Sequence, residues 1–284
     1  MRPILKTIAL GATILLLTIT EFTTIYAQGG ALMVNPKRCV FEGNKRNDVV
    51  TLYNDGDDTS SYAISFRHYE MGQNGEFKDI DSIKTDDLFC DQMVKFFPRE
   101  VTLPPHGVQT IRLQLLKPKD LAPGEYRSHL YFRSIERSKA LEYVRHDTEK
   151  TITLNLKAIY GLAIPVIVRH NTTQPKITLS NLTLSPADTE GNALLSVDIG
   201  RSGSESSYGE FILSYKDAST NETELTRVKG VGVYVPLEMR RFTMRFKMPG
   251  VVSLSTGILK LEYKSMTGEA KESTLALAQM SLMK

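Results

Sequence analysis

Hydrophobic and polar residues alternate along much of this chain, and alternation with a period of two is typical of half-buried β-strands. Turn residues separate the alternating segments, among them Asn54-Asp55-Gly56 and Gln73-Asn74-Gly75. The Asn-Gly pair favours the type I′ turn of a hairpin. About seven strands at this spacing predict a β-sandwich. They are expected over residues 31–41, 49–53, 62–69, 97–103, 108–116, 125–135 and 151–168.

A second set of strands follows the polar, proline-containing segment 169–175, which predicts a linker. The length of 284 residues agrees with two domains at roughly 150 residues each. The predicted fold class is therefore all-β, with one sandwich over residues 28–168 and another over 176–284. The second set is expected over residues 176–184, 193–199, 209–215, 224–228, 241–248, 257–263 and 275–282.

The first 27 residues predict a secretory signal peptide. Arg2 and Lys6 precede an apolar stretch over residues 7–20, and the small residue Ala27 offers a cleavage point. The apolar stretch has 14 residues, whereas a helix that spans a bilayer needs roughly 20. An uncleaved anchor is the alternative. We expect a mature chain that is exported and has no stable membrane insertion.

The two cysteines, Cys39 and Cys90, leave two interpretations open. Export leads to an oxidising compartment, where the pair can form a disulfide. Alternatively, both are small buried hydrophobic residues. The sequence does not give the Cα separation that a disulfide requires.

Composition and motifs argue against nucleic-acid binding and against catalysis. The net charge is +3, from 35 basic and 32 acidic residues, so no large basic field is expected. The five histidines show no HExxH spacing, and the chain has no GxSxG elbow and no phosphate-binding glycine loop. We therefore predict no enzyme activity, no metal site and no cofactor.

Residues 151–159 form an alternating strand in which Ile152, Leu154 and Leu156 face one way. This apolar row fits a strand whose side chains enter the protein's own core. It also fits an edge strand whose apolar row docks a strand of another protein. Exposed sheet edges are normally blunted, so an apolar edge that is not blunted indicates a docking site. The pattern alone does not choose between these alternatives.

Several ordered motifs resemble the PapD-like periplasmic pilus chaperones. The first is Arg38-Cys39-Val40-Phe41-Glu42-Gly43, at the start of the first predicted sandwich. The resemblance covers roughly residues 31–168, while the rest matches only as a second sandwich in the expected place. The other motifs are Phe97-Pro98-Arg99, Val101–Pro105, Gln109–Leu113, Gly124–Leu130, Tyr160-Gly161 and Ile164-Pro165-Val166.

The resemblance implies two immunoglobulin-like sandwiches set in an L, with a cleft between them. In this family the last strand of the first domain is lent to a pilin subunit that lacks a strand of its own. The physical principle is β-augmentation, in which the lent strand completes the subunit's ladder and its apolar row fills the open groove. The row expected to be donated is Ile152, Leu154 and Leu156.

The family fixes the register by holding the subunit's C-terminal carboxylate with an arginine and a lysine in the cleft. Arg38 matches the arginine, from its place before Val40-Phe41-Glu42-Gly43. Counted back from Pro165, the position of the lysine holds Tyr160. A phenol donates one hydrogen bond but has no positive charge. The expected carboxylate anchor is therefore Arg38 with Tyr160.

The function that the resemblance implies is a periplasmic chaperone that binds and caps pilus subunits, or other strand-deficient exported β-rich proteins, by donating a strand. Its implied partners are such a subunit and an outer-membrane usher. The alternative is a structural or adhesive immunoglobulin-like protein of a surface assembly. The first predicts a soluble complex with a strand-deficient client, and the second predicts self-association or surface attachment.

Overall fold

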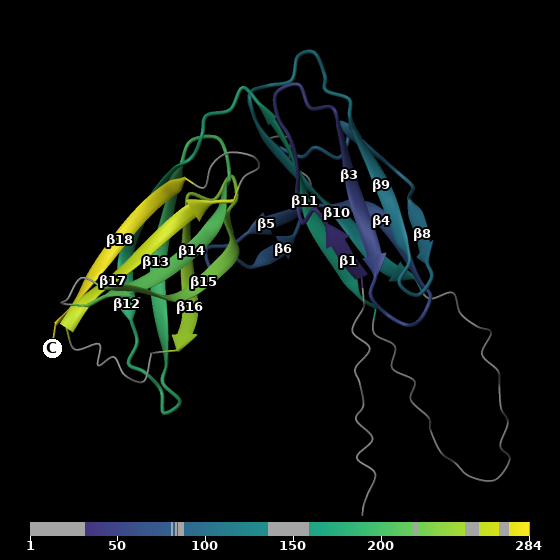
Figure 1. Ribbon diagram of the computed structural model, residues 1–284. Helices are drawn as coiled ribbons and strands as arrows, with labels where there is room; N and C mark the ends of the chain where they lie inside the picture. The colour runs from purple at the N-terminus through teal and green to yellow at the C-terminus, as the bar shows by residue number, and fades with distance from the viewer. Residues whose placement is uncertain are drawn as a thin grey trace, which may run out of the picture. The chain divides into compact units, whose positions relative to one another are not determined.

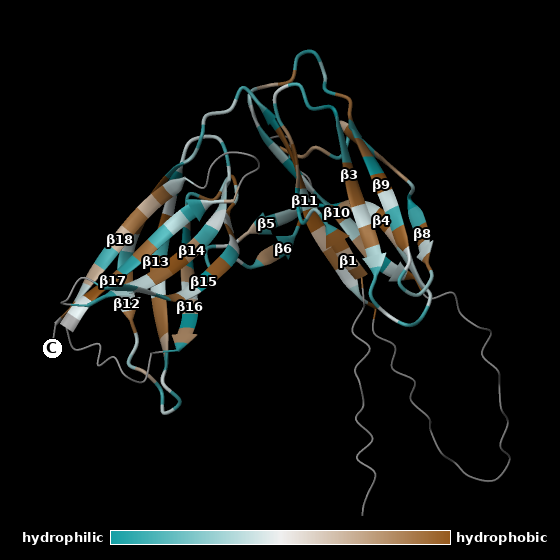
Figure 2. Ribbon diagram, in the orientation of Figure 1, coloured by the Kyte–Doolittle hydropathy of each residue, from teal (hydrophilic) through white to brown (hydrophobic). Residues whose placement is uncertain are grey.

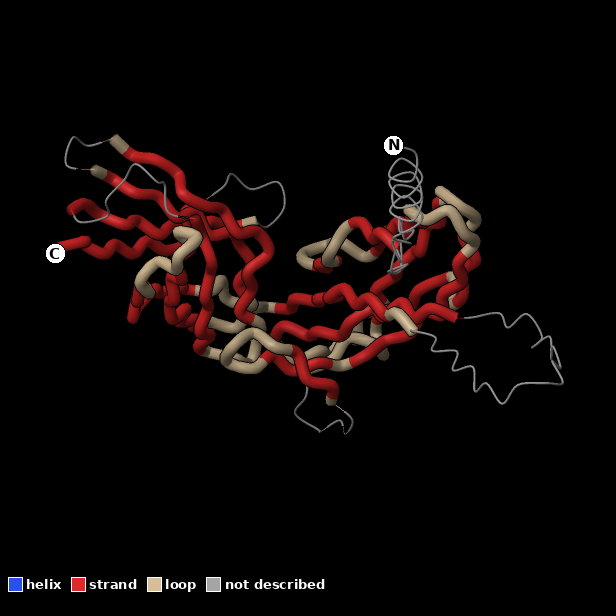
Figure 3. The backbone as a smooth tube through the Cα atoms, turned by 90° about the horizontal axis from the view of Figure 1, so that it is seen from below, coloured by secondary structure: helices blue, strands red, loops and turns tan. Residues whose placement is uncertain are grey.

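The computed structural model describes residues 32–80, 82, 84, 88–135, 159–217, 221–247, 256–266 and 273–283. These residues form eighteen strands joined by turns and loops, and none of them is helical (Figures 1 and 3). No helix in this part of the chain is long and apolar enough to cross a membrane. The predicted signal peptide lies outside the described residues.

Two sheets make the first sandwich, which spans residues 32–170. The four-stranded sheet has the order β1-β3-β9-β7, and the five-stranded sheet has the order β2-β11-β10-β4-β8. The first comprises β1 (Leu32–Asn35), β3 (Asn47–Asn54), β9 (Val108–Leu115) and β7 (Val94–Phe97). The second comprises β2 (Cys39–Phe41), β11 (Gly161–His170), β10 (Gly124–Ile135), β4 (Ser60–Arg67) and β8 (Glu100–Leu103).

Hydrophobic and hydrophilic residues alternate along many of these strands (Figure 2), and the apolar side chains of both sheets share one core. In β9, Ile111 and Leu113 are buried, while Arg112 between them is exposed. Phe132 of the facing sheet belongs to the same hydrophobic cluster. The sandwich thus forms because each strand presents one apolar face to a shared interior.

Prolines divide two segments that alternation predicts as single strands. The strand expected over 31–41 is split at Pro36 into β1 and β2, which belong to different sheets. The strand expected over 97–103 is split at Pro98 into β7 and β8, again in different sheets. Proline has no N–H to give to a ladder, so the chain leaves one sheet there and joins the other.

The hairpin expected at Gln73-Asn74-Gly75 is present, but its turn differs from the prediction. It joins β5 (Tyr69–Met71) to β6 (Phe77–Asp79), and Met71 pairs with Phe77 across a five-residue loop. Gly75 has a positive φ of 85°, while Asn74 does not have a positive φ. A type I′ turn requires positive φ at two consecutive residues, so the type I′ prediction is wrong.

The second sandwich spans residues 176–283 and has its own core. Its three-stranded sheet has the order β12-β13-β16, and its four-stranded sheet the order β15-β14-β17-β18. Buried side chains from both sheets form one cluster, in which Phe211 packs on Tyr263. The strands are β12 (Lys176–Leu184), β13 (Asn192–Ser202), β16 (Met239–Lys247), β15 (Glu222–Val233), β14 (Ser207–Lys216), β17 (Thr256–Ser265) and β18 (Thr274–Met283).

No described strand of one sandwich pairs with a strand of the other. Of the segment predicted as a linker, Arg169 and His170 belong to β11, and residues 171–175 connect β11 to β12. The fold is therefore all-β with two immunoglobulin-like sandwiches, as the sequence predicts.

Cys39 and Cys90 are both free thiols buried in the core of the first sandwich. The Cys90 thiol donates a hydrogen bond to the carbonyl of Val166 (3.2 Å). Burial is the main cause that raises the pKa of each thiol to about 12. The two cysteines are therefore small buried residues, and no disulfide joins them. This is the second of the two interpretations that the sequence leaves open.

Candidate functional site

The site lies on the face of the five-stranded sheet that points away from the core. In β2, Cys39 and Phe41 are buried in the core, so Val40 lies on the opposite face, together with the flanking Arg38 and Glu42. The parallel register sets Cys39 opposite Val166 of β11.

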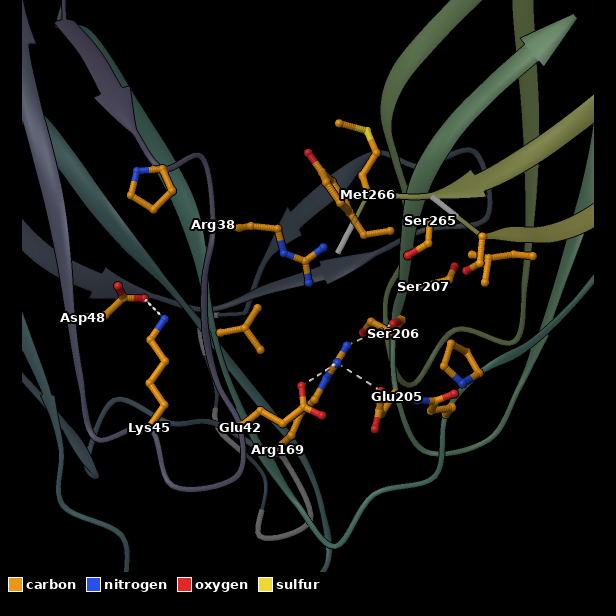
Figure 4. Close-up of a pocket in the computed structure, with 17 residues that line it drawn as sticks. Arg38, Glu42, Lys45, Asp48, Arg169, Glu205, Ser206, Ser207, Ser265 and Met266 are labelled. Carbon is orange, nitrogen blue, oxygen red and sulfur yellow. Dashed lines mark hydrogen bonds and ion pairs between the residues drawn. The ribbon is translucent and has the colours of Figure 1, made fainter. Parts of the chain in front are cut away.

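A pocket of about 710 Å³ opens beside this face (Figure 4). Its volume lies in the range of ligand sites, about 300–1,000 Å³. First-sandwich residues line one side, and residues at the ends of β14, β17 and β18 line the other. The lining consists of Pro36, Arg38, Val40, Glu42, Lys45, Asp48, Arg169, Gln174, Pro175, Glu205, Ser206, Ser207, Tyr208, Ser265, Met266, Ser273 and Leu275.

Arg38 is the lining cation without an acidic partner among the described residues. Its guanidinium carbon lies 4.3 Å from the centre of the Tyr208 ring, in a cation–π contact. All three guanidinium nitrogens are buried and make no hydrogen bond to the part of the chain that the structure describes. Lys45, by contrast, pairs with Asp48 at 2.7 Å. An unpaired buried guanidinium is costly, and a carboxylate ligand would satisfy two of its N–H groups at once.

An ionic network forms the floor of the pocket (Figure 4). Arg169 lies 3.1 Å from Glu125, 3.0 Å from Glu205 and 3.2 Å from Glu42, measured between nitrogen and oxygen atoms. The carboxylate of Glu125 also accepts hydrogen bonds from the backbone N–H of Ser206 (2.9 Å) and from its hydroxyl. The network joins β10 and β11 to the loop before β14. Its cation, Arg169, is paired with three carboxylates.

A second buried cation, Arg127, lies one row further along the same face. Arg127 of β10 stands opposite Ile167 of β11, which pairs with Val40 of β2. Its guanidinium carbon is 4.5 Å from the centre of the Tyr234 ring, and its Nη2 donates to the carbonyl of Tyr69 (3.1 Å). Its Nε and Nη1 have no partner. Burial lowers the pKa of Arg127.

His129 is the next residue on this face and is held uncharged. Burial, followed by the nearby charges of Arg127 and His68, lowers the pKa of His129 from 6.5 to about 3. Below pH 6.5 the unfolded chain therefore takes up a proton that the folded chain does not, so stability falls as the pH falls from 6.5 towards 3.

We expect His129→Gln to reduce the pH dependence of stability. Between pH 7.5 and 5.0 the lowered pKa should cost the native protein about 2 kcal/mol of unfolding free energy. Urea denaturation of both proteins at the two pH values measures this loss. Equal losses in the native protein and the variant would contradict the burial of a neutral His129.

The edge of the five-stranded sheet is open beside Arg38. β2 pairs only with Val166, Ile167 and Val168 of β11. Residues 161–165 of β11 have no strand on that side among the described residues, although β10 covers their other side. Arg38 thus stands where the covered part of the edge gives way to the open part. Ile159, just before β11, is 62% exposed.

The structure does not bring Tyr160 to Arg38. The register of β2 and β11 places Arg38 next to Pro165, five residues beyond Tyr160. The carbonyl of Tyr160 instead accepts a hydrogen bond from the backbone N–H of Ser134, and the backbone N–H of Tyr160 donates to the Ser134 hydroxyl. Tyr160 is 42% exposed. The register therefore gives no support to Tyr160 as a second anchor beside Arg38, and that role stays a prediction. The predicted donor row, Ile152, Leu154 and Leu156, lies outside the described residues.

Arg127, Tyr208 and Tyr234 are site residues that the sequence analysis missed. A usable signal exists for the first of them. In the stretch Glu125-Tyr126-Arg127-Ser128-His129, ionisable residues occupy every second position of a strand that is otherwise buried. Such spacing indicates a polar face covered by something other than solvent. Tyr208 and Tyr234 carry no comparable signal, because their role comes from contacts across long sequence separations.

Comparison with known proteins gives structural matches only. No family model matches the chain, and no curated protein matches it. A structure of the chaperone–tip adhesin complex of CFA/I fimbriae biogenesis is similar, at 14% identity, 88% coverage of this chain, 97% of that chain and a TM-score of 0.41. The Escherichia coli chaperone DraB shows 10% identity, coverage of 90% and 97%, and a TM-score of 0.42.

A third similar structure is the CsuC–CsuE chaperone–tip adhesion subunit pre-assembly complex of Acinetobacter baumannii. It shows 12% identity, covers 87% of this chain and 97% of that chain, and has a TM-score of 0.42. These structures are of fimbrial chaperones and their complexes. The sequence motifs of this chain resemble the same family.

Within the described residues, no group of three or more His, Cys, Asp and Glu side chains is arranged to hold a metal ion.

Proposed function

We propose that this protein is a periplasmic chaperone that binds and caps strand-deficient pilus subunits, or similar exported β-rich proteins, by donating a β-strand. The observation that carries the proposal is Arg38, whose three unpartnered guanidinium nitrogens adjoin a pocket and an open sheet edge. The protein acts by binding alone, without catalysis and without a cofactor.

Arg38 binds the C-terminal carboxylate of the client. Two parallel N–H···O bonds hold a carboxylate in one orientation. The Tyr208 ring stacks on the guanidinium and keeps it in place.

The client's last strand extends along the open edge of β11. With its carboxylate at Arg38, just before the first residue of β2, the client strand pairs with residues 161–165 of β11. The row Ile152, Leu154 and Leu156 then fills the groove left by the client's missing strand. Each of these side chains contributes roughly 1.5–3 kcal/mol if fully buried, before the ordering cost.

The remaining parts of the proposal concern location and partners. Residues 1–27 direct export to the periplasm and are then removed. The client is a pilin-like or other exported β-rich subunit, and an outer-membrane usher receives the complex.

The proposal is tested by isolating the exported protein from its own cells and identifying what co-purifies. Leu154→Asp should abolish capture of a strand-deficient client while the free protein stays folded, because in the proposed mechanism this row packs only against the client. A matched control is Leu194→Asp, since Leu194 is 45% exposed on the second sandwich, and it should leave capture intact.

Two outcomes would contradict the proposal. If Leu154→Asp unfolds the free protein, Leu154 belongs to the protein's own core and is not donated. If the native protein only associates with itself or with the cell surface, the structural or adhesive alternative is correct.

A further inference from the structure

The pocket beside Arg38 has a wall of which the carboxylate anchor uses only Tyr208. This wall comes from the second sandwich and contains Tyr208, Met266 and Leu275. Val40 and Pro36 of the first sandwich face it across the same pocket. These five side chains line the same pocket as Arg38, whose guanidinium would hold the client's C-terminal carboxylate.

Backbone hydrogen bonds fix this wall. The N–H of Met266 donates to the carbonyl of Tyr208 (3.1 Å), which ties the end of β17 to β14. The N–H of Ser265 donates to the carbonyl of Ser273 (2.9 Å), which ties β17 to the start of β18. A lining that is held in place discriminates between side chains better than one that adapts to each of them.

The lining charges also favour certain ligands. Once a carboxylate has neutralised Arg38, Lys45 and Arg169 carry two positive charges, whereas Glu42, Asp48 and Glu205 carry three negative charges. The side chain of Glu42 is 60% exposed and reaches the pocket from its rim. The occupied pocket is therefore net negative and repels an acidic side chain.

We propose that this pocket binds the side chain of the client's last residue, and that it accepts large apolar or basic side chains and rejects acidic ones. The inference rests on the proposed function, because it needs a carboxylate at Arg38. It adds a specificity determinant: the second sandwich and Glu42 select among chain termini that Arg38 alone would hold equally well.

The test uses fluorescein-labelled nonapeptides of alternating valine and threonine that end in Leu, Lys or Asp, each as free acid and as C-terminal amide. Binding to the full chain is measured by fluorescence anisotropy. We expect the Leu and Lys acids to bind at least about tenfold more tightly than the Asp acid. Glu42→Gln should reduce the difference between Leu and Asp to about threefold or less.

Glu224→Gln is the matched control, because Glu224 forms an exposed ion pair with Arg227 at 2.9 Å on the second sandwich. It should leave the tenfold preference unchanged. Equal affinity for the three acids, or a preference that Glu42→Gln leaves intact, overturns the inference while the anchor stands. Equal binding of acids and amides overturns the proposed function itself, so the two failures are distinguishable.

Discussion

Arg38→Ala is expected to weaken binding of a client's C-terminal segment by about 100-fold, which corresponds to about 2.7 kcal/mol. The variant removes a bidentate charge-assisted pair and one of the positive charges that line the pocket. It should leave the fold intact, because the guanidinium makes no hydrogen bond within the protein. Calorimetry with a free-acid peptide from the captured client measures the loss.

The same peptide as a C-terminal amide is the control ligand, because it lacks the carboxylate. It should bind the native protein weakly, and Arg38→Ala should change its affinity little, because the interaction is already missing. Arg245→Ala is the control, since Arg245 pairs with Asp188 at an exposed site on the second sandwich. An acid and an amide that lose affinity equally on Arg38→Ala would show that Arg38 does not contact the carboxylate.

Glu125→Ala should lower the free energy of unfolding by about 3–5 kcal/mol, the largest stability effect expected in this chain. Glu125 is 3% exposed and accepts hydrogen bonds from Arg169 and Ser206. Its removal leaves Arg169 buried with less negative charge and leaves the Ser206 N–H without its acceptor. Urea denaturation measures the change.

The comparison variant is Glu224→Ala, whose exposed ion pair with Arg227 should contribute no more than about 1 kcal/mol. If Glu125→Ala costs as little as Glu224→Ala, the buried network does not stabilise the contact between β10 and the loop before β14. Glu125→Gln keeps the side-chain shape and should fall between the two, because it retains one acceptor oxygen.

Much of the fold could be predicted from the sequence, because many of its strands are half-buried and leave a period-two pattern. The pattern in β9 assigns Ile111 and Leu113 to the core correctly. It missed the breaks at Pro36 and Pro98, across which the core-facing positions change from even-numbered to odd-numbered residues as the backbone moves to another sheet. A proline within a strand pattern is the local signal for such a move.

The candidate site was less predictable. Arg38 lines a pocket, and a short ordered motif surrounds it in the sequence. The position of Tyr160 relative to Arg38 depends on the register between β2 and β11, which joins residues that are far apart in the sequence, and no local pattern records it. The partnerless nitrogens of Arg127 depend on the ring of Tyr234 above it, which is again a long-range contact.

The brevity of β2 has a consequence for the whole molecule. The chain arrives from β1, turns at Pro36 and follows β11 for three residues before it departs. Had it joined the sheet a few residues earlier, its own backbone amides would occupy the place we assign to a client. The break at Pro36 thus leaves the backbone groups along one side of residues 161–165 open to pair with a strand from another protein.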